Sequence, residues 1–115
     1  MQFGDILKNP ESEGKEKHVP IIEIIKDHGP DKVNIVHVVV GKEVAHPNTV
    51  EHHIAWIEVY GIKPEGQVIN LGRSSFAPGY TRPTISLSVP VEQFKSFCAV
   101  SYCNLHGVWQ SCLDG

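Results

Sequence analysis

The sequence predicts an all-β protein with an immunoglobulin-like fold, an antiparallel β-sandwich of about seven strands. Its 115 residues are typical of one domain with one hydrophobic core. Short segments rich in β-branched and aromatic residues are separated by turns that contain Gly and Pro. No segment has apolar residues at helical spacing over the length of a helix. Two packed antiparallel sheets are therefore the expected architecture.

The first half of the chain contains three predicted strands. Residues 1–17 form a polar N-terminal arm, and the ordered fold is expected to begin near His18. The first strand, 19–25, contains Pro20, which cannot donate to a ladder, so this strand is expected at a sheet edge or at a bulge. The second strand is 33–40 and the third is 54–60. The connection between them, 41–53, is far longer than a usual hairpin loop of about 2–5 residues, and long loops often have a function.

The rest of the chain again alternates short β-rich segments with turns. Residues 67–76 end in an APGYTRP turn, and residues 84–89 alternate apolar and polar side chains. Residues 94–102 lead into the turn CNLHG, and 108–113 form the last strand. The whole chain, residues 1–115, is predicted to be a single domain.

Composition and charge argue against several classes of protein. Hydrophobic residues make up 41% and charged residues 20%, which suits a globular chain. The formal net charge of -3 provides no positive field, so neither nucleic acid nor a membrane surface is an expected partner. The sequence shows neither a run of roughly 20 apolar residues nor the pattern of an export signal. Three cysteines in the last fifth of the chain are a poor disulfide framework, so we expect a soluble protein of the reducing cytoplasm.

Seven histidines are the unusual feature of the composition. Cys103 and His106 have two residues between them in a turn, and both side chains can reach one metal ion because Gly107 lets the backbone tighten. Taken alone, this pair indicates a metal site no more strongly than it indicates a buried cysteine that happens to lie near a histidine. His46 and His52 in the long loop and His18 before the first strand add further imidazoles. The chain thus offers four imidazoles and one thiolate.

Not every histidine or cysteine is expected to belong to this site. His52 and His53 are adjacent and point to opposite faces of an extended chain, and His52 is favoured because it shares parity with Ile54. His28 and His37 are interpreted as surface or satisfied core histidines. Cys98 is interpreted as a small buried hydrophobic residue, and nothing near Cys112 indicates an activated thiol. The charged residues of the arm are expected in solvent, with Glu16 and Lys17 as exceptions because they adjoin His18.

Five donors of this kind narrow the choice of metal. Structural zinc is satisfied by four ligands, and blue copper uses an axial Met, whereas the one methionine here is Met1. Haem attachment and iron–sulfur clusters need cysteines that are absent from the sequence. Mononuclear non-haem iron remains, with imidazoles in a plane, an axial thiolate and one open coordination position. A cupredoxin-like electron-transfer protein and a metal-stapled binding module without catalysis are the alternatives.

Three motifs resemble those of a known family. EKHVP at 16–20, HPNTVEHHI at 46–54 and CNLHG at 103–107 resemble, in order, the motifs of superoxide reductase, also called neelaredoxin, and of the catalytic domain of desulfoferrodoxin. The resemblance covers residues 15–115 and implies an immunoglobulin-like sandwich. It implies that Cys103 is the axial iron ligand, that Glu16 is the sixth ligand in the resting ferric form and that Lys17 is the cationic residue at the open face. The equatorial ligands that it implies are His18, His46, His52 and His106.

The resemblance also implies a reaction and partners. The chain has no cysteine before Cys98, so it resembles the one-iron class, which lacks the additional four-cysteine iron domain of desulfoferrodoxin. The implied activity is the one-electron reduction of superoxide to hydrogen peroxide, without production of dioxygen. The implied electron donor is a rubredoxin-like protein, and the implied assembly is a homo-oligomer, a tetramer.

Overall fold

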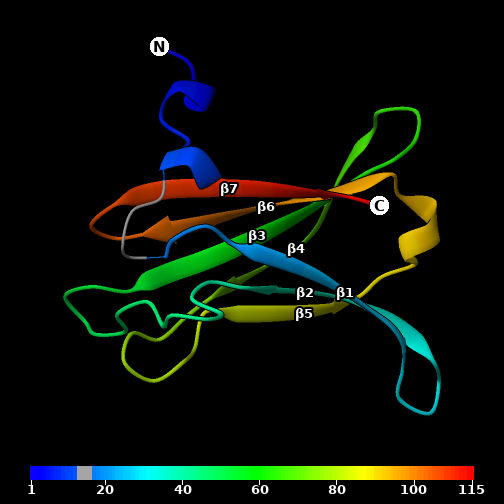
Figure 1. Cartoon of the computed structure of the whole chain (residues 1–115), viewed down its shortest axis with the longest axis horizontal. Coiled ribbons are helices and arrows are strands. Elements are labelled where there is room, and N and C mark those ends of the chain that lie inside the picture. Colours follow the sequence, from blue (N-terminus) through cyan, green and yellow to red (C-terminus); the bar gives the residue numbers. More distant parts are fainter. Residues whose placement is uncertain (13–16) are drawn as a thin grey trace.

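Two antiparallel sheets pack against each other in the computed structural model, which describes residues 1–12 and 17–115 (Figure 1). One sheet has the order β1-β2-β5, with β1 at Ile21–His28, β2 at Val33–Val39 and β5 at Thr84–Ser88. The other has the order β4-β3-β6-β7, and its strands are β3 (Ile54–Ile62), β4 (Val68–Ser75), β6 (Ser96–Cys103) and β7 (Gly107–Asp114). The predicted all-β sandwich is therefore confirmed.

Short 3-10 turns are the helical elements of the described residues: η1 (Phe3–Asp5), η2 (Pro10–Ser12) and η3 (Val91–Gln93). In the part of the chain that is described, no helix has the length and apolar character needed to cross a bilayer.

The core lies between the sheets and follows from alternation along the strands. Val36 and Val38 of β2 and Ile57 and Val59 of β3 are fully buried, because every second side chain of each strand faces the opposite sheet. Strand β6 alternates in the same way up to its last residue, Cys103, which is also fully buried. The alternation that builds the core thus places the Cys103 sulfur inside the end of the sandwich.

Two predictions about the first half of the chain are confirmed. Strand β1 begins at Ile21, immediately after Pro20, and is an edge strand that pairs only with β2. Residues 40–53, between β2 and β3, form no strand. Their backbone is fixed by turns of their own, including a pair of hydrogen bonds between Thr49 and His52.

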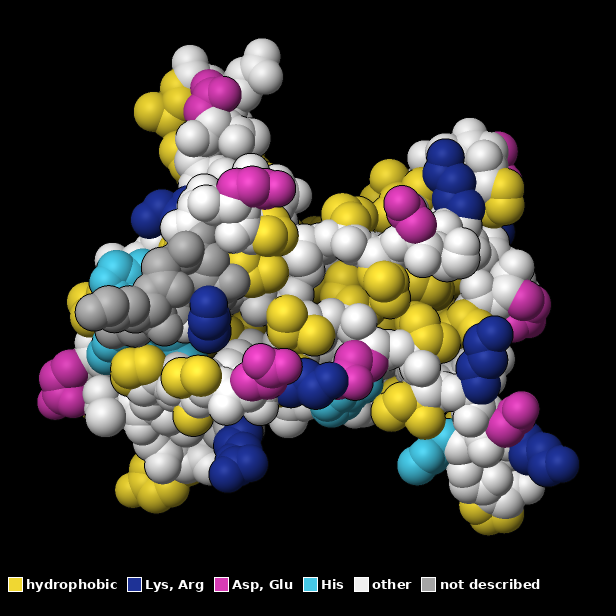
Figure 2. Space-filling model, in the orientation of Figure 1, with side chains coloured by type: hydrophobic (Ala, Val, Ile, Leu, Met, Phe, Trp, Pro, Cys, Tyr) yellow, Lys and Arg dark blue, Asp and Glu magenta, His cyan; other side chains and the backbone are white. Residues whose placement is uncertain are grey.

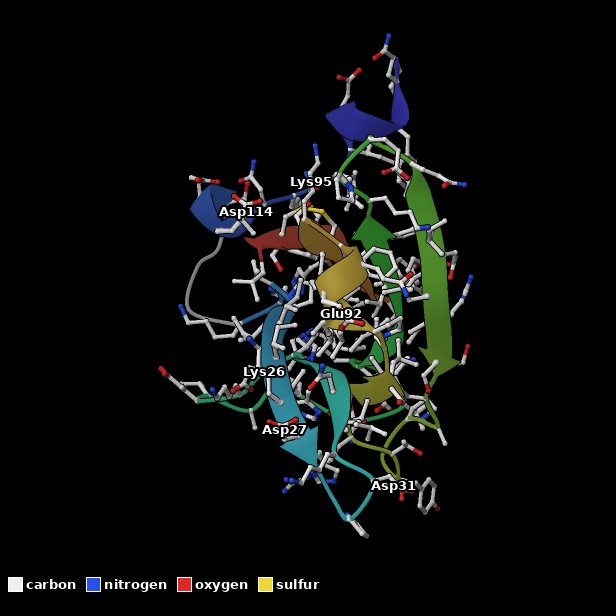
Figure 3. All side chains as sticks on the ribbon, turned by 90° about the vertical axis from the view of Figure 1, so that its right-hand side faces the viewer. Lys26, Asp27, Asp31, Glu92, Lys95 and Asp114 are labelled. Carbon is white, nitrogen blue, oxygen red and sulfur yellow. A yellow bond between two sulfur atoms is a disulfide. The ribbon has the colours of Figure 1, made fainter. Side chains whose placement is uncertain are left out.

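The prediction that the cysteines form no disulfide is wrong, because Cys98 and Cys112 are bonded to each other. Cys98 is also not a core residue: the alternation of β6 buries Phe97 and Ala99, so Cys98 lies on the outer face of the sheet. The register of β6 and β7 sets Cys112 directly opposite Cys98. The bond is the yellow link between sulfurs near Lys95 in Figure 3.

Ordered contacts begin earlier in the chain than the expected start near His18. The amide of Lys8 donates to the carbonyl of Val108 at 2.9 Å, and the amide of Gln110 donates to the carbonyl of Lys8 at 2.8 Å. Lys8 therefore adds one parallel bridge to the free edge of β7, and it is exposed, as expected for a charged residue of the arm.

Candidate metal centre

Three segments that are far apart in sequence meet at one end of the sandwich. They are the chain that enters β1, the loop before β3 and the turn between β6 and β7, all on the left in Figure 1. Figure 2 shows histidine side chains gathered at the same end. The opposite end carries charged side chains such as Lys26, Glu92 and Asp114 (Figure 3).

Four side chains form a compact group there: His18, His46, His52 and Cys103. Each offers one ligand atom, and these atoms all lie within 4.8 Å of one another. His18, His46 and Cys103 are buried, and His52 is partly buried. The separation and the type of these atoms suit the shared coordination of one metal ion.

His106 extends this group into a closed square of four imidazoles. Neighbouring rings stand edge to face at centroid distances of 4.8 Å (His18–His46), 4.7 Å (His46–His52), 5.0 Å (His52–His106) and 4.9 Å (His106–His18). The interplanar angles lie between 68° and 80°. His18 is thus across from His52, and His46 across from His106, as in a set of rings turned toward one centre.

The Cys103 sulfur contacts two opposite corners of this square. It lies 3.6 Å from His46 Nε2 and 3.7 Å from His106 Nδ1, so it is nearly equidistant from the two nitrogens. His106 Nδ1 is also 3.1 Å from His18 Nε2. The atoms that His46 and His106 turn toward the centre are therefore Nε2 and Nδ1, respectively.

The orientation of His46 follows from its own loop. Its Nδ1 forms a hydrogen bond of 2.7 Å with the carbonyl oxygen of Pro47, so Nδ1 carries the proton and Nε2 is left as a donor atom for a metal. Gly41 lets the loop close on this residue. Its φ is +80°, and a Cβ there would meet the His46 amide nitrogen at 2.6 Å.

His53 lies outside the group, in agreement with the parity argument that favoured His52. Its Nδ1 forms a hydrogen bond with the carbonyl oxygen of Thr49 at 3.0 Å, and its amide donates to Asn104 Oδ1 at 2.8 Å. The side chain of Asn104 also donates to the carbonyl oxygen of Glu51 at 2.9 Å. Asn104 therefore ties the CNLHG turn to the histidine loop, a role that the sequence analysis missed.

Two more residues that the sequence analysis missed hold His18. The hydroxyl of Ser101 donates to the carbonyl oxygen of His18 at 2.9 Å, and the Trp109 ring is stacked on the His18 ring. Ser101 shares the parity of Cys103 on β6, so a polar residue at a core position was the signal available in the sequence.

The other residues singled out from the sequence lie as follows. Glu16 lies outside the described residues. Lys17 is exposed and lines a cavity of about 280 Å³ with residues of the loop that begins at Gly41. His28 is exposed at the end of β1, and His37 is hydrogen-bonded to the Ser86 hydroxyl at 2.7 Å, so both match their interpretation as non-ligands.

The donor set fits one mononuclear iron. Neutral imidazoles and a buried thiolate are ligands of transition metals, and five such donors exceed the four of a structural zinc site. A blue-copper site would use an axial methionine, but Met1 is fully exposed on the arm. Among the described residues, Cys103 is the one free cysteine, so it is the sulfur ligand that this part of the chain offers.

Comparisons with known proteins agree with this geometry. The model of the desulfoferrodoxin family matches residues 10–112. The chain is 42% identical to a protein named superoxide reductase from Pyrococcus abyssi, over 93% of each chain. It is 39% identical to neelaredoxin from Megalodesulfovibrio gigas, over 84% of each chain. A crystal structure of superoxide reductase in the oxidised state superposes with a TM-score of 0.86 at 34% identity and covers 98% of both chains.

Proposed function

Because the chain belongs to the desulfoferrodoxin family, we propose that it catalyses the one-electron reduction of superoxide to hydrogen peroxide at one iron. The observation that supports this most directly is the imidazole square with the Cys103 sulfur within 3.7 Å of ring nitrogens at two of its corners. Iron is the metal of the family. The cupredoxin-like alternative is not favoured.

The roles of the residues follow from their places. The residues that would hold the iron are His18, His46, His52, His106 and Cys103. When bound, iron supplies the single electron that superoxide takes up. Cys103 is fully buried and would donate electron density to the metal when it is bound. The hydrogen bond from His46 Nδ1 to the Pro47 carbonyl oxygen leaves Nε2 as the donor atom for the metal.

Besides the electron, the reaction needs two protons and a way to attract the anionic substrate. Superoxide takes one electron and two protons to give hydrogen peroxide, and no dioxygen forms. Lys17 is proposed to attract the anionic substrate, and Glu16 is proposed as the sixth ligand of the resting ferric form. A rubredoxin-like protein is the proposed electron donor.

Metal analysis together with product stoichiometry tests this function. The purified protein should contain one iron per chain and should form one hydrogen peroxide per superoxide consumed in the presence of a reductant. Dismutation would give half as much peroxide and would release dioxygen. Dioxygen release, or copper or zinc as the native metal, would contradict the proposal.

Substitution of Lys17 by alanine should slow the bimolecular reaction with superoxide by roughly tenfold and flatten its dependence on salt. The protein has a formal charge of -3, so its overall field opposes an approaching anion, and a local cation must counter this. Lys17→Arg should keep most of the rate. Pulse radiolysis at several ionic strengths measures both effects. A wild-type rate with a wild-type salt slope in Lys17→Ala would show that this lysine does not guide the substrate.

The oligomeric state and the cellular location of the protein are proposals as well. We propose a homotetramer, which the mass measured by light scattering tests. The cytoplasmic location stays a prediction, and the disulfide removes one of its premises because disulfides are rare in reducing compartments.

A further inference from the structure

One indole touches two of the proposed iron ligands. The Trp109 ring is stacked on the His18 imidazole, with centroids 4.6 Å apart and an interplanar angle of 13°. Its Nε1–H donates a hydrogen bond to the carbonyl oxygen of His106 at 3.2 Å. Trp109 is only 4% exposed, so water does not compete effectively for either contact. A single rigid side chain therefore supports two adjacent corners of the imidazole square.

Lys8 holds the same indole. Its Nζ lies 5.2 Å from the centroid of the Trp109 ring, within the range of a cation–π contact, and donates to the carbonyl oxygen of His106 at 3.0 Å. The Lys8 backbone is fixed as well, through its two hydrogen bonds to β7. Figure 1 shows the N-terminal arm beside β7. The ammonium group is thus kept next to the metal centre by both its main chain and its side chain.

From these contacts we propose that Trp109 and Lys8 are positioning residues of the metal centre. Trp109 fixes the plane of the His18 ring and the carbonyl of the His106 turn, and Lys8 holds Trp109 and supplies a fixed positive charge. Ser101 secures only the backbone of His18, whereas the indole acts on the ring itself. The inference rests on the proposed function for the use of the site in reduction, but its first test requires only that the site bind a metal.

The charge of Lys8 has its own consequence. A fixed cation favours the less positive oxidation state of a nearby metal, because the ferric form is repelled more strongly than the ferrous form. The reduction potential of the iron should therefore depend on Lys8. Contacts around a ligating histidine commonly change metal affinity by about 10- to 100-fold, which sets the scale for Trp109.

The test for Trp109 is a titration of the metal-free protein with Co²⁺ against a chelator, with the visible spectrum recorded at each step. Trp109→Leu should bind Co²⁺ about 10- to 100-fold more weakly and with a changed spectrum. Trp109→Phe keeps an aromatic ring but lacks the N–H, so its affinity should lie between those of Trp109→Leu and the wild type. The matched control is Trp56→Leu, which removes an indole stacked on Tyr102 and close to Arg73 on the outer face, and it should leave Co²⁺ affinity unchanged.

The test for Lys8 is the potential of the iron-loaded protein. Lys8→Met should lower the reduction potential, Lys8→Arg should retain it, and Lys26→Met, at the opposite end of the molecule (Figure 3), should leave it unchanged.

Wild-type Co²⁺ affinity in both Trp109 variants, or equal losses for Trp109→Leu and Trp56→Leu, would overturn the role of the indole. If Trp109→Leu fails to fold, the Co²⁺ affinity of Trp109→Phe decides whether the indole has this role. An unchanged potential in Lys8→Met would overturn the role of the lysine. Normal Co²⁺ binding without superoxide reduction would count against the proposed function alone.

Discussion

Replacement of Cys103 by serine is expected to abolish the thiolate-to-iron charge-transfer absorption and to lower the rate with superoxide by more than about 100-fold. A serine hydroxyl is a poor substitute for a soft, electron-donating thiolate. Loss of a contact around a ligand already costs about 10- to 100-fold, so loss of the ligand itself should cost more. Cys98 and Cys112 cannot replace it, because they are bonded to each other. The visible spectrum and pulse radiolysis measure the two effects.

Cys98→Ser and Cys112→Ser are the matched controls for this substitution. Both change a cysteine of the same β6–β7 hairpin, but on the outer face of the sheet. They should keep the absorption band and most of the reductase rate. If Cys112→Ser loses the band while Cys103→Ser keeps it, the proposed sulfur ligand is wrong.

Loss of the Cys98–Cys112 disulfide should lower the free energy of unfolding by about 3 kcal/mol. The bond closes a loop with a sequence separation of 14 residues, and the chain-entropy model gives this value for a loop of about 15 residues. Urea denaturation with and without a reductant measures the difference. A reductant should not affect Cys98→Ser, since that variant has no disulfide to lose.

The loss of stability without the disulfide and the loss of activity without Cys103 should be separable. A reduced wild-type protein is expected to be less stable and still reactive toward superoxide, whereas Cys103→Ser is expected to be inactive with its disulfide intact. Equal stability of the reduced and oxidised wild type would show that the β6–β7 pairing alone holds this hairpin.

Much of the fold could be predicted because local pattern and burial agree along this chain. Val36 and Val38, and Ile57 and Val59, alternate with partly exposed residues, so the strand period is visible in the sequence itself. Pro20 marked the beginning of an edge strand for a purely local reason, its missing N–H. The preference for His52 over His53 rested on the same two-residue period.

The errors concern relations between segments, which local pattern does not contain. The disulfide depends on the register of β6 against β7, and a shift of one residue would have turned Cys112 away from Cys98. The contact of Lys8 with Trp109 depends on where the arm crosses the edge of β7. Ser101 and Asn104 looked like ordinary polar residues of a strand end and a turn, because their partners, His18 and Glu51, lie far away in the sequence.

The wide separation of the metal-binding segments along the chain has a consequence for folding. His18 and His106 are 88 residues apart, yet their ring nitrogens lie 3.1 Å from each other. Contacts of such long range form late, because the loop between them must close first. The unfolded chain therefore presents no preassembled site, and we expect metal loading to follow chain collapse. A metal that binds only the native state then stabilises it in proportion to the logarithm of the free metal concentration. Iron supply would in this way set the lifetime of the protein as well as its activity.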